Sequence, residues 1–117
     1  METFTKLGQC IEYTYRTREA WVEERRRMAK GDKSNCAIHY VVQHILEARG
    51  ESFPIRHLDD EHVTELMHEL EDEHDWSART TNKIPTYLGT VLKHCWEKRK
   101  IKELPYRRYD RRKVRER

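Results

Sequence analysis

The chain has 117 residues, of which 38% are charged and 36% hydrophobic, and its formal net charge is +3. This length favours one small domain. Three Trp and six Tyr argue against disorder, and four Gly and three Pro are too few for the tight turns of a β-sandwich or barrel. No run approaches the roughly 20 apolar residues of a transmembrane helix, and no secretory signal is visible.

The three cysteines, Cys10, Cys36 and Cys95, are odd in number and far apart, without a Cys-x-x-Cys pair. This spacing favours reduced thiols in a cytosolic protein over a disulfide framework or a zinc site. We therefore expect a cytoplasmic protein without membrane partners.

Helical periodicity dominates the first part of the chain. Residues 3–30 predict helix, with Thr3 or Thr5 as the cap and Gly31 at the end. The apolar positions drift in the middle of this stretch, so the pattern fits either one bent helix or two short ones.

A clearer helix is predicted over residues 32–49, with Asp32 as N-cap and Gly50 as a left-handed C-terminal residue. One stripe repeats at helical spacing and predicts the buried side: Ile38, Val41, Val42 and Ile45. The opposite side would show Lys33, Cys36, Tyr40, Gln43 and His44.

Residues 51–58 predict an extended connection, because Pro54 disfavours the α conformation in the residue before it. A third helix then starts with Asp59 as cap and with Leu58 packing on Val63 as a hydrophobic staple. It ends near Asp75.

The fourth helix is predicted from Ser77 to about Arg99, and Pro85 complicates its start. Either the helix kinks at Pro85, or residues 77–82 form a separate turn and the regular helix begins near Asn82. Beyond residue 104 the helical spacing of apolar residues stops. We therefore divide the chain into a helical domain, 1–104, and a basic linker or arm, 105–117.

Charge is distributed unevenly along the chain. Residues 98–117 hold eleven Lys or Arg and three Asp or Glu, residues 59–75 hold nine acidic and no Lys or Arg residues, and residues 76–96 hold no acidic residue. A stretch of 21 residues without a carboxylate suggests a surface that does not repel an anion. The acidic helix should point away from nucleic acid, although its carboxylates could simply provide solubility.

Short polar and cationic side chains gather on the face of the fourth helix opposite its apolar stripe, and such side chains suit phosphates and base edges. Together with the exposed face of the second helix they form the predicted DNA-binding set: Lys33, Tyr40, Gln43, Arg79, Thr80, Asn82, Lys83, Thr86, Thr90 and Lys93. An ordinary solvated helix face remains the alternative.

Catalytic and metal signatures are missing from the sequence. There is no Gly-x-Ser-x-Gly motif or glycine-rich phosphate loop, and Cys36 with His39 has no matching second pair of metal ligands. We expect a non-catalytic chain without cofactor or metal.

The layout resembles the N-terminal core-binding domain of phage integrases, the tyrosine recombinase family. The segment Ser77-Ala78-Arg79-Thr80-Thr81-Asn82-Lys83 is similar to the family's Ser-x-x-Thr-x-Asn-Arg motif, with Lys83 in place of the usual Arg. Further similarity lies at the end of the second helix, in the connection, at the start of the third helix, and in the residues that close the fourth helix: 47–50, 53–55, 58–63 and 92–101. The resemblance also implies a bacterial or phage-encoded protein.

This resemblance implies an all-α fold, a small orthogonal SAM-like bundle of four to five helices. It implies that the domain forms half of a clamp around duplex DNA at a recombination site. The family's catalytic Arg, Lys, His-x-x-Arg and Tyr belong to a separate C-terminal domain and are not found here. The implied partners are double-stranded DNA, that catalytic domain of the same protein, and other recombinase protomers on DNA.

Two other functions fit the sequence. A small helical protein-interaction module could use the acidic helix or exposed aromatic residues such as Trp76. A stand-alone regulator could use a helix-turn-helix, although the connection of about eight residues between the second and third helices is longer than the 3–4 residues of that motif.

Overall fold

Five α-helices of eleven residues or more form the chain, together with one four-residue helix and one 3-10 turn, in a computed structural model that describes residues 3–33 and 36–104. In chain order the elements are α1 (Leu7–Thr17), α2 (Glu19–Ala29), α3 (Ala37–Arg49), η1 (Ile55–His57), α4 (Asp60–His74), α5 (Ala78–Thr81) and α6 (Lys83–Glu97). The described residues contain no strand beyond an isolated bridge, Lys6 to Pro54. The predicted all-α bundle is confirmed.

The first predicted helix is two helices, α1 and α2, because Arg18 adopts an extended conformation between them (φ −90°, ψ 121°). The predicted threonine caps are wrong. The residue preceding α1 is Lys6, and the Gln9 side chain accepts hydrogen bonds from the backbone N–H groups of Thr5 and Lys6 at 3.0 and 3.1 Å. A side chain inside the helix thus stabilises the turn that enters it.

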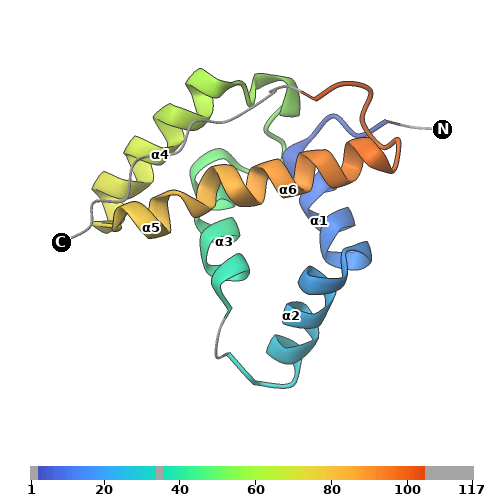
Figure 1. Ribbon diagram of the computed structural model, residues 1–117, viewed down its shortest axis with the longest axis horizontal. Helices are drawn as coiled ribbons and strands as arrows, with labels where there is room; N and C mark the ends of the chain where they lie inside the picture. Colours follow the sequence, from blue (N-terminus) through green and yellow to red (C-terminus); the bar gives the residue numbers. More distant parts are fainter. Residues whose placement is uncertain (1–2, 34–35, 105–117) are drawn as a thin grey trace.

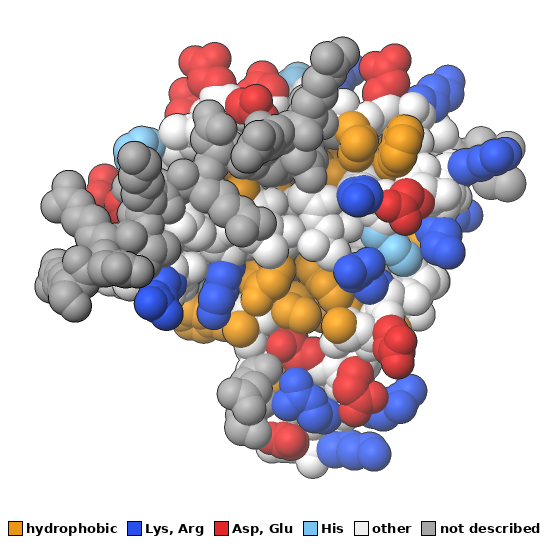
Figure 2. All heavy atoms as spheres, in the orientation of Figure 1, with side chains coloured by type: hydrophobic (Ala, Val, Ile, Leu, Met, Phe, Trp, Pro, Cys, Tyr) orange, Lys and Arg blue, Asp and Glu red, His pale blue; other side chains and the backbone are white. Residues whose placement is uncertain are grey.

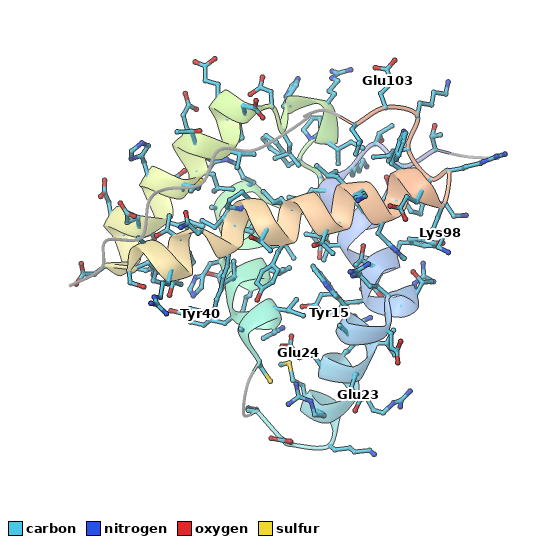
Figure 3. The ribbon with its side chains drawn as sticks, viewed as in Figure 1. Tyr15, Glu23, Glu24, Tyr40, Lys98 and Glu103 are labelled. Atoms are coloured by element: carbon cyan, nitrogen blue, oxygen red, sulfur yellow. The ribbon has the colours of Figure 1, made fainter. Side chains whose placement is uncertain are left out.

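The predicted start of the second helix is also wrong: α3 begins at Ala37, not after Asp32. Its first backbone N–H groups are bound by Glu24, a residue of α2 that is only 3% exposed. The two oxygens of this carboxylate accept from Ile38 N–H at 3.3 Å and His39 N–H at 2.9 Å. A carboxylate at a helix N-terminus also interacts favourably with the helix dipole. Figure 3 shows Glu24 on α2, pointing toward the start of α3.

The expected features of α4 are present. Asp59 accepts a hydrogen bond from His62 N–H at 2.8 Å, and Asp75 ends the helix in the left-handed conformation (φ 53°). Leu58 and Val63 are both buried, as a hydrophobic staple requires. The preceding connection is extended at Pro54 and closes into the 3-10 turn η1, which the sequence did not predict.

Pro85 does not kink the last helix, because the alternative with a separate first turn is the correct one. Ser77 caps the short α5 by accepting from Thr80 N–H at 3.3 Å, and α6 begins at Lys83 after Asn82. Pro85 is therefore the third residue of α6. The first four N–H groups of a helix have no partner within it, so the missing N–H of proline costs little there.

The last helix, α6, forms the centre of the bundle. It packs against α1, α3, α4 and α5, and Figure 1 shows it running across α1 and α3. Its buried side chains include Leu88, Val91 and Leu92, while Cys95 donates from Sγ to the backbone carbonyl of Cys10 on α1 at 3.6 Å. All three cysteines are free thiols.

Two further predictions concern the whole chain. Among the described residues, no helix combines the length and apolar character that crossing a membrane requires. The predicted basic linker, residues 105–117, lies outside the described part of the chain.

Candidate nucleic-acid interface

The candidate interface is the exposed side of α5 and α6. The opposite side of α6 is fixed by burial of Ile84, Leu88 and Val91 in the core. At helical spacing this leaves Arg79 and Lys93 exposed, while the other predicted contact residues of the segment are half-buried: Thr80, Asn82, Lys83, Thr86 and Thr90. Asn82, the residue between α5 and α6, has helical dihedral angles (φ −66°, ψ −14°).

The threonines of α6 direct their hydroxyl hydrogens to their own helix. Thr86 Oγ1 donates to the Asn82 carbonyl at 3.1 Å, and Thr90 Oγ1 donates to the Thr86 carbonyl at 2.9 Å. Donation to a phosphate would require these hydroxyls to rotate out of those bonds. The cationic side chains of Arg79, Lys83 and Lys93 are therefore the stronger candidates for anion binding.

These cations face little competition from carboxylates. Within residues 3–33 and 36–104, no carboxylate lies within 4.0 Å of Arg79 or Lys83. Lys93 Nζ lies 4.0 Å from Glu97 Oε1, and both side chains are more than half exposed, so this pair is weak.

The acidic helix α4 directs its charge elsewhere. Glu69 pairs with Arg49 of α3 at 2.7 Å, not with Lys83 or Lys93. Figure 2 shows acidic side chains along the upper edge of the molecule, where Figure 1 places α4, and basic side chains below them at the left. In this view the acidic side chains at the upper edge lie apart from the basic ones at the left, whereas acidic and basic side chains intermingle lower down, where Figure 1 places α2.

The predicted residues of the second helix are only partly brought to this surface. Lys33 precedes α3 in the α2–α3 connection, which Figure 1 shows at the lower tip of the molecule, away from α5. Gln43 is exposed and donates to Glu47 at 3.4 Å. Tyr40 is 49% exposed, and its hydroxyl accepts from Trp76 Nε1 at 3.1 Å. Since Trp76 directly precedes Ser77, this bond places Tyr40 beside the start of α5.

Sequence reasoning missed the ring cluster that makes this connection. The rings of Tyr40 and His44, both on α3, pack against the rings of His74, the last residue of α4, and Trp76, which follows α4. The ring centroids of the two histidines lie 4.2 Å apart, and those of His74 and Trp76 lie 5.4 Å apart. Trp76 is only 9% exposed, so the expectation of an exposed Trp76 is wrong. The spacing of Tyr40 and His44, one helical turn, was visible in the sequence, but their partners come from the far end of α4.

Two further features of the described residues concern metal binding and the buried His94. Among them, no group of three or more His, Cys, Asp or Glu is placed to hold a metal ion. His94, on the inner side of α6, has its pKa lowered by burial and then by the nearby charges of Arg18 and Lys98. Its Nε2 lies 2.8 Å from Thr17 Oγ1, whose own hydrogen is donated to the Tyr13 carbonyl. In the tautomer with the hydrogen on Nε2, His94 donates a hydrogen bond to Thr17 Oγ1, so this imidazole joins α6 to α1.

Comparison with known proteins identifies no relative: no family model, curated protein or solved structure matches this chain.

Proposed function

We propose that this chain binds duplex DNA through the exposed face of α5 and α6, as the core-binding domain of a site-specific tyrosine recombinase. The observation that carries the proposal is a helical surface with Arg79, Lys83 and Lys93 on a stretch without carboxylates. Lys and Arg are the side chains that neutralise phosphates and release their counterions.

Recognition would combine two kinds of contact. The cations would bind phosphates and position the domain, while Asn82, Thr86 and Tyr40 are the candidates for base edges and sugars. A contact set dominated by phosphates predicts micromolar or weaker binding with modest sequence preference, and a steep dependence on salt.

The assignment to the recombinase family is supported by the resemblance of residues 77–83 to its motif and by the helical bundle. In this proposal the domain supplies half of a clamp, a separate C-terminal domain supplies the strand-exchange chemistry, and other protomers bind the same DNA. The chain itself has no catalytic role in the proposal.

The test is a salt titration of duplex binding by fluorescence anisotropy. We expect the double variant Arg79→Glu, Lys83→Glu to lose most of its affinity while keeping its circular dichroism spectrum, because Arg79 is exposed and Lys83 is only half-buried. The slope of log affinity against log salt should flatten by roughly 0.9 for each phosphate that the variant no longer neutralises.

The matched control is Arg16→Glu, Lys30→Glu, which changes the net charge equally at exposed positions on α1 and after α2. This control should retain most of the binding. Equally weak binding by the two variants, or weakening only when residues 111–117 are deleted, would place the interaction outside α5 and α6.

The protein-interaction alternative loses Trp76, which is buried, whereas Tyr40 and Trp96 are 49% and 46% exposed. The helix-turn-helix alternative is weakened by the ten residues that separate Arg49 from Asp60, which include the 3-10 turn η1.

A further inference from the structure

A groove lies beyond the C-terminal end of α6, at the other end of that helix from Arg79 and Lys83. It measures about 770 Å³ and is formed where three segments meet: the N-terminal residues, the connection after α3, and the residues that follow α6. Its apolar lining consists of Phe4, Pro54, Ile55, Ile101 and Leu104. Hydrophobic side chains gather at the upper right of Figure 2, where Figure 1 places the segment after α6.

The rim of the groove is positively charged. Lys6, Arg56 and Lys102 line it and are exposed, and none of the described carboxylates lies within 4.0 Å of these three. The one acidic residue of the lining is Glu103, which Figure 3 shows pointing outward from the segment after α6. A ligand that covers the apolar lining lies beside these three cations, so negative charges on the ligand would strengthen its binding.

The two walls of the groove differ in their backbone hydrogen bonds. On the N-terminal wall, Phe4 N–H donates to the Lys100 carbonyl at 2.7 Å and Leu7 N–H to the Phe53 carbonyl at 2.8 Å. On the other wall, the backbone groups of residues 101–104 make no backbone–backbone hydrogen bond within the described residues. The main-chain groups of this segment are therefore open to hydrogen bonds from an occupant, although residues 100–103 form bends and not a strand.

The chain's own C-terminal residues are a poor occupant for this groove. Residues 105–117 contain seven Lys or Arg and two acidic residues, so their charge has the same sign as the rim. A nucleic acid is disfavoured because the lining offers bases a single half-buried ring, Phe4, to stack on. The other half-buried members, Pro54 and Leu104, offer nothing to phosphates, and Ile55 and Ile101 are only 7% and 4% exposed.

We propose that this groove binds an extended peptide segment of a partner protein in which apolar residues alternate with Asp or Glu. Side chains alternate between the two sides of an extended peptide. One side would fill the apolar lining, and the other would present carboxylates to Lys6, Arg56 and Lys102. The main-chain groups of residues 101–104 would add single hydrogen bonds to the peptide backbone, without forming a strand ladder. This surface is distinct from α5 and the start of α6, so it does not depend on the DNA-binding proposal.

The test uses the whole 117-residue chain and an acetylated, amidated peptide Glu-Leu-Glu-Phe-Glu-Leu-Glu. In ¹H–¹⁵N correlation spectra, the peptide should shift the amide signals of Phe4 and residues 101–104. Lys102→Glu should weaken binding roughly tenfold, because each exposed pair contributes up to about 1 kcal/mol and reversal adds repulsion. The matched control Lys30→Glu, at an exposed position on another part of the chain, should bind like the wild type.

Two control peptides separate the contributions of charge and apolar contact. Replacing Leu and Phe by Ser, or Glu by Lys, should abolish the shifts at residues 101–104. Undiminished binding of the Ser peptide, equal affinities of the two protein variants, or shifts confined to other helices would overturn the proposal. Shifts of the same groove amides by a duplex oligonucleotide would overturn it too, in favour of a nucleic-acid occupant.

Discussion

The helices α3 and α4 begin in different ways. At the start of α4 the cap is local, since Asp59 binds the N–H of His62 three residues further along the chain. At the start of α3 the cap is distant in sequence, since Glu24 of α2 binds the N–H groups of residues 38 and 39. A local cap can form before the rest of the fold, whereas the cap on α3 exists only once α2 and α3 are packed. The Glu24 contact therefore couples the start of α3 to the tertiary structure.

The largest effect should come from breaking the distant cap. Glu24→Ala removes a buried carboxylate that accepts two backbone hydrogen bonds, and we expect a loss of roughly 2–3 kcal/mol in the free energy of unfolding. Urea denaturation followed by circular dichroism measures this loss. Glu24→Gln, which retains one acceptor, should lose less. A Glu24→Ala protein as stable as the wild type would show that this carboxylate does not hold the start of α3.

Breaking the local cap should cost less. Asp59→Ala removes one side-chain hydrogen bond at an exposed helix start, which typically costs about 1 kcal/mol. The same denaturation experiment applies, and Asp59→Asn or Asp59→Ser should recover most of the loss because both residues are good caps. If the Asp59→Ala variant proves less stable than the Glu24→Ala variant, the order that this comparison predicts is reversed.

The smallest expected effect is on the pH dependence of stability. It comes from His94, which takes part in neither helix cap, so it can be compared with the effects of both caps. Burial lowers the pKa of His94 in the folded protein below its ordinary value of 6.5. The unfolded chain therefore takes up a proton first as pH falls, and the stability present above pH 6.5 decreases until the folded-state pKa is passed.

The measurement is the melting temperature between about pH 7.5 and about pH 5, a range that brackets the titration of histidine, for the wild type and for His94→Gln, whose amide can still donate to Thr17. The difference between the two pH profiles isolates His94 from the other histidines. Parallel profiles would mean that this imidazole titrates alike in both states.

Helix identity could be predicted from the sequence where the determinants lie close together in the chain. The cap Asp59, the apolar spacing of α4 and the Ser77 turn before Pro85 are all local, and the structure confirms them. The start of α3 was mispredicted because Asp32 resembles a cap in sequence, and nothing in the sequence indicates that Glu24 reaches the same N–H groups from another helix.

The candidate site shows the same limit. The absence of acidic residues from 76–96 could be read directly from the chain, and so could the exposed positions of Arg79 and Lys93. Sequence reasoning could not predict that Trp76 turns inward to Tyr40, because that contact joins residues 36 positions apart. We predicted Lys33 beside α5 because we placed it inside the second helix. That helix, α3, begins only at Ala37.

The buried thiols of α1 and α6 give the molecule an internal reporter of its own opening. Cys10 and Cys95 are fully buried where these two helices meet, whereas Cys36 is partly accessible just before α3. An alkylating reagent should modify Cys36 in the native protein and reach the other two only when α6 separates from α1. The labelling rates of the three cysteines, resolved by mass spectrometry, would thus measure how often the centre of the bundle opens, without any introduced probe.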